Sequence, residues 1–185
     1  MIPTIILDLD ATLNDMEQQI YNLFLDQYDL DIYERKENLP FSLEQIHRLI
    51  EKHELHYKTV PLKGAYELFQ AIRNQGYEIG ILTGRKCFFN ESDNVTTDWL
   101  KLHRLEPDWL EIMLGNKLIA IEAKKVDCVL FLDDESNHLI QVSEAKVAKY
   151  VGTISYHYNQ NLPSSILVFN NLEEVRKFVL TLPKI

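Results

Sequence analysis

The sequence has little cysteine and no long apolar run. Its 185 residues include two cysteines, Cys87 and Cys128, without the CxxC spacing of a zinc knuckle or the numbers of a disulfide framework. No stretch approaches the roughly 18 apolar residues that a membrane span needs. The first residues, Met1–Thr4, lack the basic and long apolar regions of a signal peptide. We therefore expect a cytoplasmic protein, in which Cys128 packs within an apolar run.

Positive charge is also scarce. The chain has 19 lysines and arginines against 28 aspartates and glutamates, a formal net charge of -9. The averaged field repels a nucleic-acid backbone, so long nucleic acid is not the expected partner, although a local basic site could hold one phosphate. Six glycines, six prolines, 46% hydrophobic and 25% charged residues are typical of a globular protein. The length favours one domain, or one domain with a modest insertion.

Short apolar runs alternate with helical patterns along most of the chain. An apolar run at 4–7 is followed by further strand candidates at 77–83, 110–114, 128–132, 147–151 and 166–169. Strands separated by helices imply right-handed βαβ units. The sequence therefore predicts an α/β fold, a Rossmann-like parallel sheet flanked by helices.

One stretch, residues 14–60, carries no strand signal. It contains two capping-box signatures, Asp15–Gln18 and Ser42–Gln45, each followed by apolar residues at helical spacing. We therefore predict a core domain of residues 1–13 and 61–185, with a small helical cap, residues 14–60, inserted after the first strand.

Three predicted strands end in polar residues. In parallel sheets, ligands bind outside the carboxyl ends of the strands, so these residues are the candidate site. They are Asp8 and Asp10, then Thr83, Gly84 and Arg85, and finally Asp133 and Asp134. Aspartates gathered at one edge repel a phosphate unless a cation is present, and Mg²⁺ prefers oxygen ligands. The acidic residues therefore imply a metal.

Three sequence motifs resemble signature motifs of the haloacid dehalogenase (HAD) superfamily of phosphatases. They are Asp8-Leu9-Asp10-Ala11-Thr12-Leu13, Thr83-Gly84-Arg85 and Asp133-Asp134. The resemblance implies a HAD-like core and a Mg²⁺-dependent phosphatase that acts through an aspartyl phosphate. The fourth motif of that superfamily is a lysine at the start of a helix. Lys117, Lys124 and Lys125 are candidates, and Lys117 is favoured because it opens the helical stretch.

The resemblance also implies a role for each residue. Asp8 is the nucleophile, while Asp10 is the general acid and base, which requires surroundings that raise its pKa. The expected phosphate-binding residues are Thr83, Gly84, Arg85 and Lys117. The expected metal-binding residues are Asp8, Asp10, Asp133 and Asp134. Arg85 has two open interpretations, since its guanidinium group could pair with substrate phosphate or with an acidic residue.

The expected substrate is a small phosphorylated metabolite, with a nucleotide favoured. Thr83-Gly84-Arg85 followed by Thr97-Asp98-Trp99-Leu100 is similar to nucleotidases and to the phosphatase domain of polynucleotide kinases. Cap residues could stack on or pair with a nucleotide, or simply form the core and surface of the cap. These residues are Tyr21, Tyr28, Tyr33, Arg35, Lys36 and Phe41.

Other functions stay open at this stage. A sugar-phosphate phosphatase or phosphomutase of the same superfamily, or a catalytically silent binding module, would fit the same fold. A receiver domain also has acidic strand ends, but the Asp8–Thr12 pattern and the long insertion do not suit one. The six histidines lack metal-ligand spacing and are expected to pack or lie on the surface.

Overall fold

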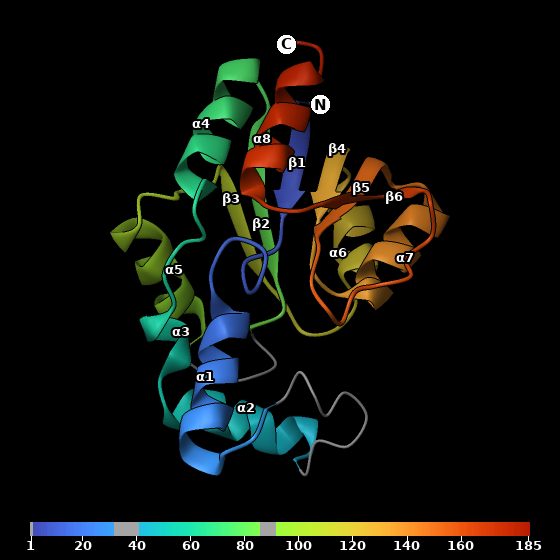
Figure 1. Cartoon of the computed structure of the whole chain (residues 1–185). Helices are drawn as coiled ribbons and strands as arrows, with labels where there is room; N and C mark the ends of the chain where they lie inside the picture. The colour runs from blue at the N-terminus through green and yellow to red at the C-terminus, as the bar shows by residue number, and fades with distance from the viewer. Residues whose placement is uncertain (1, 32–40, 86–91) are drawn as a thin grey trace.

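The computed structural model describes residues 2–31, 41–85 and 92–185. Within these residues the strands form one parallel sheet in the order β3-β2-β1-β4-β5-β6 (Figure 1). The strands are β1 (Pro3–Leu7), β2 (Glu78–Thr83), β3 (Trp109–Ile112), β4 (Asp127–Leu132), β5 (Ala148–Ile154) and β6 (Ile166–Phe169). The central strands are continuous apolar runs because helices cover both of their faces. The predicted α/β fold is confirmed.

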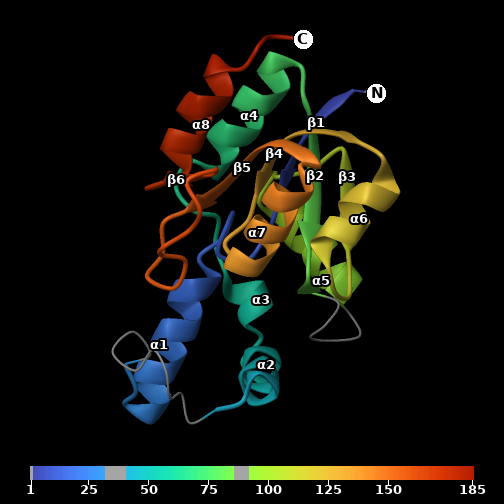
Figure 2. The same cartoon turned by 90° about the vertical axis from the view of Figure 1, so that its right-hand side faces the viewer.

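Helices pack on both faces of the sheet (Figure 2). Helices α4 (Ala65–Gln75) and α8 (Leu172–Thr181) contact each other on one face, where α5 (Ser92–Leu102) adds Trp99 to the same apolar cluster. Helices α6 (Lys117–Lys124) and α7 (Ser136–Ala145) form a second cluster on the opposite face. None of the described helices is long and apolar enough to cross a bilayer.

Among the described residues between β1 and α4, three helices lie beyond the carboxyl ends of the strands (Figure 1). They are α1 (Met16–Tyr28), α2 (Leu43–Lys52) and α3 (Leu55–Lys58). Their apolar side chains form a separate small cluster. We call this helical group the cap; its predicted extent, residues 14–60, stays a prediction.

The two predicted capping boxes have different outcomes. Ser42 Oγ accepts from Gln45 N at 3.2 Å and Gln45 Oε1 accepts from Ser42 N at 2.7 Å, which confirms the box. Asp15 precedes α1 but forms no such bond, so that prediction was wrong. Its carboxylate instead accepts from Val60 N at 2.7 Å and thereby ties the two ends of the cap together.

Candidate active site

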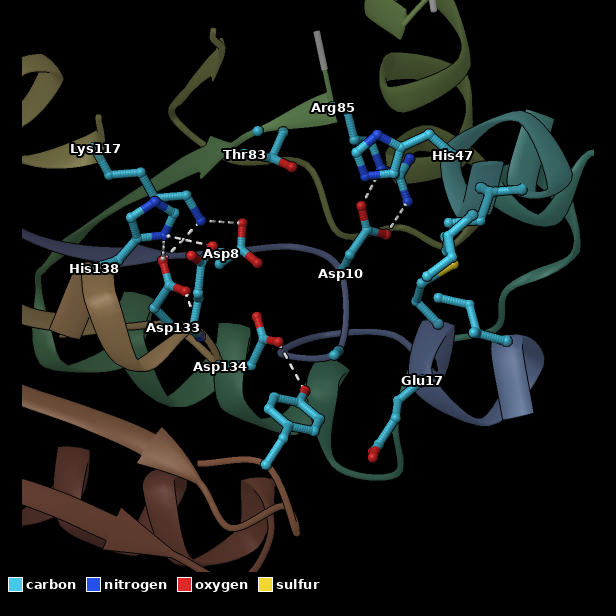
Figure 3. A pocket seen from close by; sticks show the side chains of 18 of the residues that line it. Asp8, Asp10, Glu17, His47, Thr83, Arg85, Lys117, Asp133, Asp134 and His138 are labelled. Carbon is cyan, nitrogen blue, oxygen red and sulfur yellow. Dashed lines mark hydrogen bonds and ion pairs between the residues drawn. The ribbon is translucent and has the colours of Figure 1, made fainter. Parts of the chain in front are cut away.

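The structure brings the polar strand ends to one edge of the sheet. Strand β1 lies between β2 and β4: the chain runs from β1 to β2 and β3 on one side and then crosses to β4, β5 and β6 on the other. Such a switch point leaves a crevice at the carboxyl ends of the strands. Asp8 N donates to Leu132 O at 2.8 Å, which fixes the end of β1 against the end of β4. Figure 3 shows the side chains from β1, β2, β4 and α6 around this crevice.

Lys117 connects two of the carboxylates. Its Nζ lies 2.6 Å from Asp8 Oδ1 and 2.7 Å from Asp133 Oδ2, and the side chain is buried at the first residue of α6. The two flanking acids raise the pKa of Lys117 against the opposing effect of burial. Lys124 pairs with Glu111 at 3.0 Å, and Lys125 is an exposed residue in the left-handed conformation after the helix. Of the three candidate lysines, Lys117 is the one that contacts the aspartates at the strand ends.

Asp8, Asp133 and Asp134 form a compact carboxylate cluster. Each offers an oxygen, and these oxygens lie within 4.8 Å of one another. Burial raises the pKa of Asp8 to about 7 although Lys117 opposes the rise, and burial with Asp133 and Asp8 nearby raises the pKa of Asp134 well above its usual value. At Asp133, burial is outweighed by Lys117 and His138 together, which lower its pKa. One ammonium group does not neutralise three carboxylates, two of them buried and the third, Asp134, half-buried, so this oxygen-only donor set fits a hard divalent cation.

The Asp10 side chain contacts different residues from those around the carboxylate cluster. Its carboxylate accepts two bonds from Arg85, from Nε at 2.8 Å and from Nη2 at 2.5 Å, and a third from Asn14 Nδ2 at 2.9 Å. His56 Nδ1 lies 3.9 Å away, and burial lowers the pKa of that imidazole to about 4. The pairing of Arg85 with an acidic residue is one of the two alternatives that the sequence left open.

The expected rise in the pKa of Asp10 does not occur. Burial acts in the expected direction, but the charge and hydrogen bonds of Arg85 outweigh it and hold the pKa well below its usual value. This expectation was wrong because Arg85, which lies 75 positions away in the sequence, pairs with Asp10 in the fold. Nothing in the local Asp8–Thr12 pattern indicates which charged side chain will face Asp10.

Several residues of the site were missed in the sequence. His138 Nδ1 lies 3.5 Å from Asp133 Oδ2, and that carboxylate raises the pKa of His138 despite burial. Tyr158 donates from its hydroxyl group to Asp134 Oδ2 at 2.7 Å (Figure 3). Across the crevice, His157 Nδ1 lies 3.1 Å from Glu17 Oε1 and so joins the core to α1. None of these residues belongs to a motif, although His138 lies in the first turn of α7, five positions after Asp133.

The carboxylate cluster lines a cavity of about 810 Å³ between core and cap. Thr83, Gly84 and Arg85 line it together with the acidic residues and Lys117. The cap contributes mainly aliphatic side chains, together with Glu17, His47 and His56; the aliphatic ones are Met16, Ile20, Ile46 and Ile50. Among the polar residues on the core side are His157, Tyr158, Gln160 and Asn161.

Three of the aromatic cap residues named as possible stacking partners, Tyr21, Tyr28 and Phe41, do not line the cavity. Phe41 and Tyr28 contact each other with ring centroids 5.1 Å apart, and both contact Phe24. The interpretation as cap packing therefore holds for Phe41 and Tyr28. Tyr33, Arg35 and Lys36 lie outside the described residues, as does Cys87, whereas Cys128 is buried as predicted.

Comparisons with known proteins agree with this geometry. The model of the family described as "5' nucleotidase, deoxy (Pyrimidine), cytosolic type C protein" matches residues 1–180. No curated protein sequence matches the chain. Similar solved structures include a HAD-superfamily hydrolase from Ehrlichia chaffeensis, with 16% identity, 96% coverage of each chain and a TM-score of 0.53. A hydrolase from Pseudomonas syringae gives 18% identity, 96% and 97% coverage and a TM-score of 0.62. CbbY from Rhodobacter sphaeroides, solved with phosphate, gives 15% identity, 95% and 96% coverage and a TM-score of 0.62.

Proposed function

Since this chain belongs to the family of deoxy (pyrimidine) 5′ nucleotidases of cytosolic type C, we propose that it hydrolyses a nucleoside monophosphate with Mg²⁺ as its cofactor. The chain is a HAD-superfamily phosphatase, a hydrolase acting on phosphate monoesters. The observation that carries the proposal is the convergence of Asp8, Lys117, Asp133 and Asp134 inside a capped cavity.

Asp8 is the proposed nucleophile. One of its carboxylate oxygens bonds to phosphorus while the bond from phosphorus to the leaving oxygen breaks, which gives an aspartyl phosphate and an alcohol. Water then attacks that phosphorus, releases inorganic phosphate and restores the Asp8 carboxylate. Lys117, 2.6 Å from Asp8, holds this side chain in position and offers positive charge to the phosphoryl oxygens. Thr83, Gly84 and Arg85 are the other proposed phosphate contacts.

Asp8, Asp133 and Asp134, with the backbone carbonyl of Asp10, are the proposed metal-binding groups. A bound Mg²⁺ ion would offset the negative charge of these carboxylates and of the substrate phosphate. The presence of three acidic side chains with a single buried lysine among them supports this proposal.

Asp10 is the proposed general acid and base. While it is paired with Arg85 its carboxylate is ionised, but the lowered pKa makes it a weak base for the attacking water. Protonation of the leaving alkoxide requires the acid form, so we propose that Arg85 shifts toward the substrate phosphate when substrate binds. The two interpretations of Arg85 then describe successive states of one side chain.

The cavity supports an organic phosphate rather than a long polymer. Its volume of about 810 Å³ lies in the range of small-molecule sites. The aliphatic cap wall can cover a flat base, and polar side chains such as Gln160 and Asn161 can bond to sugar or base atoms. The net charge of -9 also disfavours a nucleic-acid partner. A cytoplasmic location stays a prediction.

A panel of phosphate monoesters tests this proposal. Purified chain with Mg²⁺ is assayed for released phosphate on nucleoside monophosphates, sugar phosphates and 3′-phosphorylated oligonucleotides. We expect the highest kcat/KM on a nucleoside monophosphate, and loss of all activity in Asp8→Asn. A higher kcat/KM on a sugar phosphate or an oligonucleotide would contradict the proposed substrate. Transfer of phosphate between positions of one sugar would indicate a mutase instead.

A further inference from the structure

The segment after β5, residues 155–161, is fixed to the site by a buried asparagine. Asn159 is 2% exposed, and its Nδ2 donates to Thr153 Oγ1 at 2.9 Å, to Ile154 O at 2.8 Å and to Asp134 O at 3.2 Å. Its Oδ1 accepts from Tyr156 N at 2.8 Å. This side chain therefore ties the segment both to its own strand and to the backbone of Asp134.

The same segment presents one hydroxyl group to the carboxylate cluster. Tyr158 donates to Asp134 Oδ2 at 2.7 Å. The Tyr156 ring lies parallel to that of Tyr158, with an interplanar angle of 4° and centroids 5.4 Å apart. Asn159 and Tyr156, which lie on either side of Tyr158 in the sequence, thus hold its hydroxyl group in place.

A carboxylate that binds a metal needs a fixed orientation. Asp134 can rotate about its side-chain bonds, and repulsion from Asp8 and Asp133 would favour turning away from them in the absence of an ion. A hydrogen bond to Oδ2 opposes that rotation and leaves Oδ1 as the oxygen available to a cation. Partners of this kind, which bind the ligand and not the ion, commonly change metal affinity by about 10- to 100-fold when removed.

We propose that Tyr158 is a positioning residue that orients Asp134 for the divalent cation through its hydroxyl group. The inference rests on the proposed function, because the cation is part of that proposal. Nothing in the motifs assigns a role to this tyrosine, which lies 24 positions after Asp134 on another strand-end segment. This effect on metal affinity does not require substrate, so the affinity can be measured on the protein with metal alone.

The test is Mn²⁺ binding to the purified chain, measured by calorimetry and by the electron paramagnetic resonance signal of free Mn²⁺. Tyr158→Phe removes the hydroxyl group and keeps a ring that is 43% exposed, so the fold is expected to persist. We expect the Kd for Mn²⁺ to rise about 10-fold or more. The matched control is Tyr156→Phe, which removes a hydroxyl group from the same segment and should change Kd by less than about twofold.

A double-mutant cycle distinguishes positioning from general damage. In the Asp134→Asn background, adding Tyr158→Phe should cause no further loss of Mn²⁺ affinity, since the two side chains act as one unit. In activity assays at fixed substrate, the Mg²⁺ concentration for half-maximal activity of Tyr158→Phe should rise above that of the wild type.

Each other outcome has a definite meaning. A wild-type Kd in Tyr158→Phe would overturn the inference and leave the proposed function standing. Equal weakening in Tyr156→Phe and Tyr158→Phe would also overturn it, because the segment as a whole would then be responsible. A wild-type chain that binds no Mn²⁺ would contradict the metal in the proposed function and, with it, this role of Tyr158.

Discussion

At the scale of single residues, the two aspartates of the first motif have opposite surroundings. Asp8 faces Lys117 and two other acids, and burial raises its pKa to about 7. Asp10 faces the Arg85 guanidinium and Asn14, and its pKa lies well below the usual value. Two carboxyl groups that are two positions apart can therefore take different roles in one reaction.

Replacement of Asp10 should affect substrates according to their leaving groups. In Asp10→Asn, we expect kcat on a nucleoside monophosphate to fall about 10²- to 10⁴-fold, because the alkoxide leaves without a proton donor. An aryl phosphate has a more stable leaving anion, so the fall in kcat on that substrate should be at least about tenfold smaller. Steady-state kinetics on both substrates provide the measurement. Equal losses on the two would show that Asp10 does not protonate the leaving group.

The pKa of Asp8 makes the stability of the metal-free chain depend on pH. A carboxyl group whose folded pKa is raised, here from 3.8 to about 7, stabilises the fold fully below its unfolded pKa. That contribution is lost as pH rises through the folded pKa. We therefore expect the free energy of unfolding in EDTA to fall from pH 5 to pH 8 by a few kcal/mol more in the wild type than in Asp8→Asn. The comparison is needed because His56, whose pKa is lowered to about 4, contributes in the opposite direction in both chains. Urea denaturation at the two pH values measures the difference.

Divalent cation provides the control for this pH effect. Mg²⁺ binds the ionised carboxylates, so its addition should stabilise the chain more at pH 8 than at pH 5. The variant Asp8→Asn lacks the titrating group and should show a smaller pH difference in EDTA. An equal pH difference in the wild type and in Asp8→Asn would contradict the burial of uncompensated charge at Asp8.

At the scale of elements, apolar patterns predicted each of the six described strands but not all of their bounds and contacts. The 166–169 strand has the predicted bounds, whereas β5 continues to Ile154, beyond the predicted end at Val151. Residues 152–154 pair with β6, and that pairing is a property of the sheet and not of the local sequence. The capping box at Ser42 formed because it needs only neighbouring residues, while Asp15 found a distant partner, Val60.

The pairing of β2 with β3 leaves no room for a side chain at Gly80. A Cβ atom there would lie 2.0 Å from Trp109 Cζ2, and Gly80 is in register with Trp109. We expect Gly80→Ala to lower the free energy of unfolding by about 1–3 kcal/mol, since the indole ring must shift within the packed interface. Denaturant unfolding monitored by tryptophan fluorescence gives the value.

Gly84 is the matched control for that substitution. It follows the same strand, and a Cβ atom there would meet nothing within 4 Å. Gly84→Ala should therefore change the free energy of unfolding by less than about 0.5 kcal/mol. A loss in Gly84→Ala as large as that in Gly80→Ala would attribute the cost to glycine itself and not to contact with the indole ring.

At the scale of the whole molecule, the site is assembled from separate parts of the chain. Strand ends at Asp8, Thr83 and Asp133 could be predicted to meet, because the carboxyl ends of parallel strands share one edge. The sequence left open whether Arg85 pairs with an acid, and it did not identify Asp10 as the partner. The His157–Glu17 contact and the bond from Tyr158 could not be predicted, because they depend on how loops and the cap pack. The sequence is thus most informative where sheet topology dictates the contact.

The central claim is that Asp8 becomes phosphorylated during turnover. The direct measurement is acid quenching of the chain with substrate and Mg²⁺, borohydride reduction of acyl phosphates, and peptide mass spectrometry. The account predicts conversion of Asp8 to homoserine in the presence of substrate and Mg²⁺, and no conversion without substrate. Phosphate release with modification at Asp10, or at no aspartate, would contradict it.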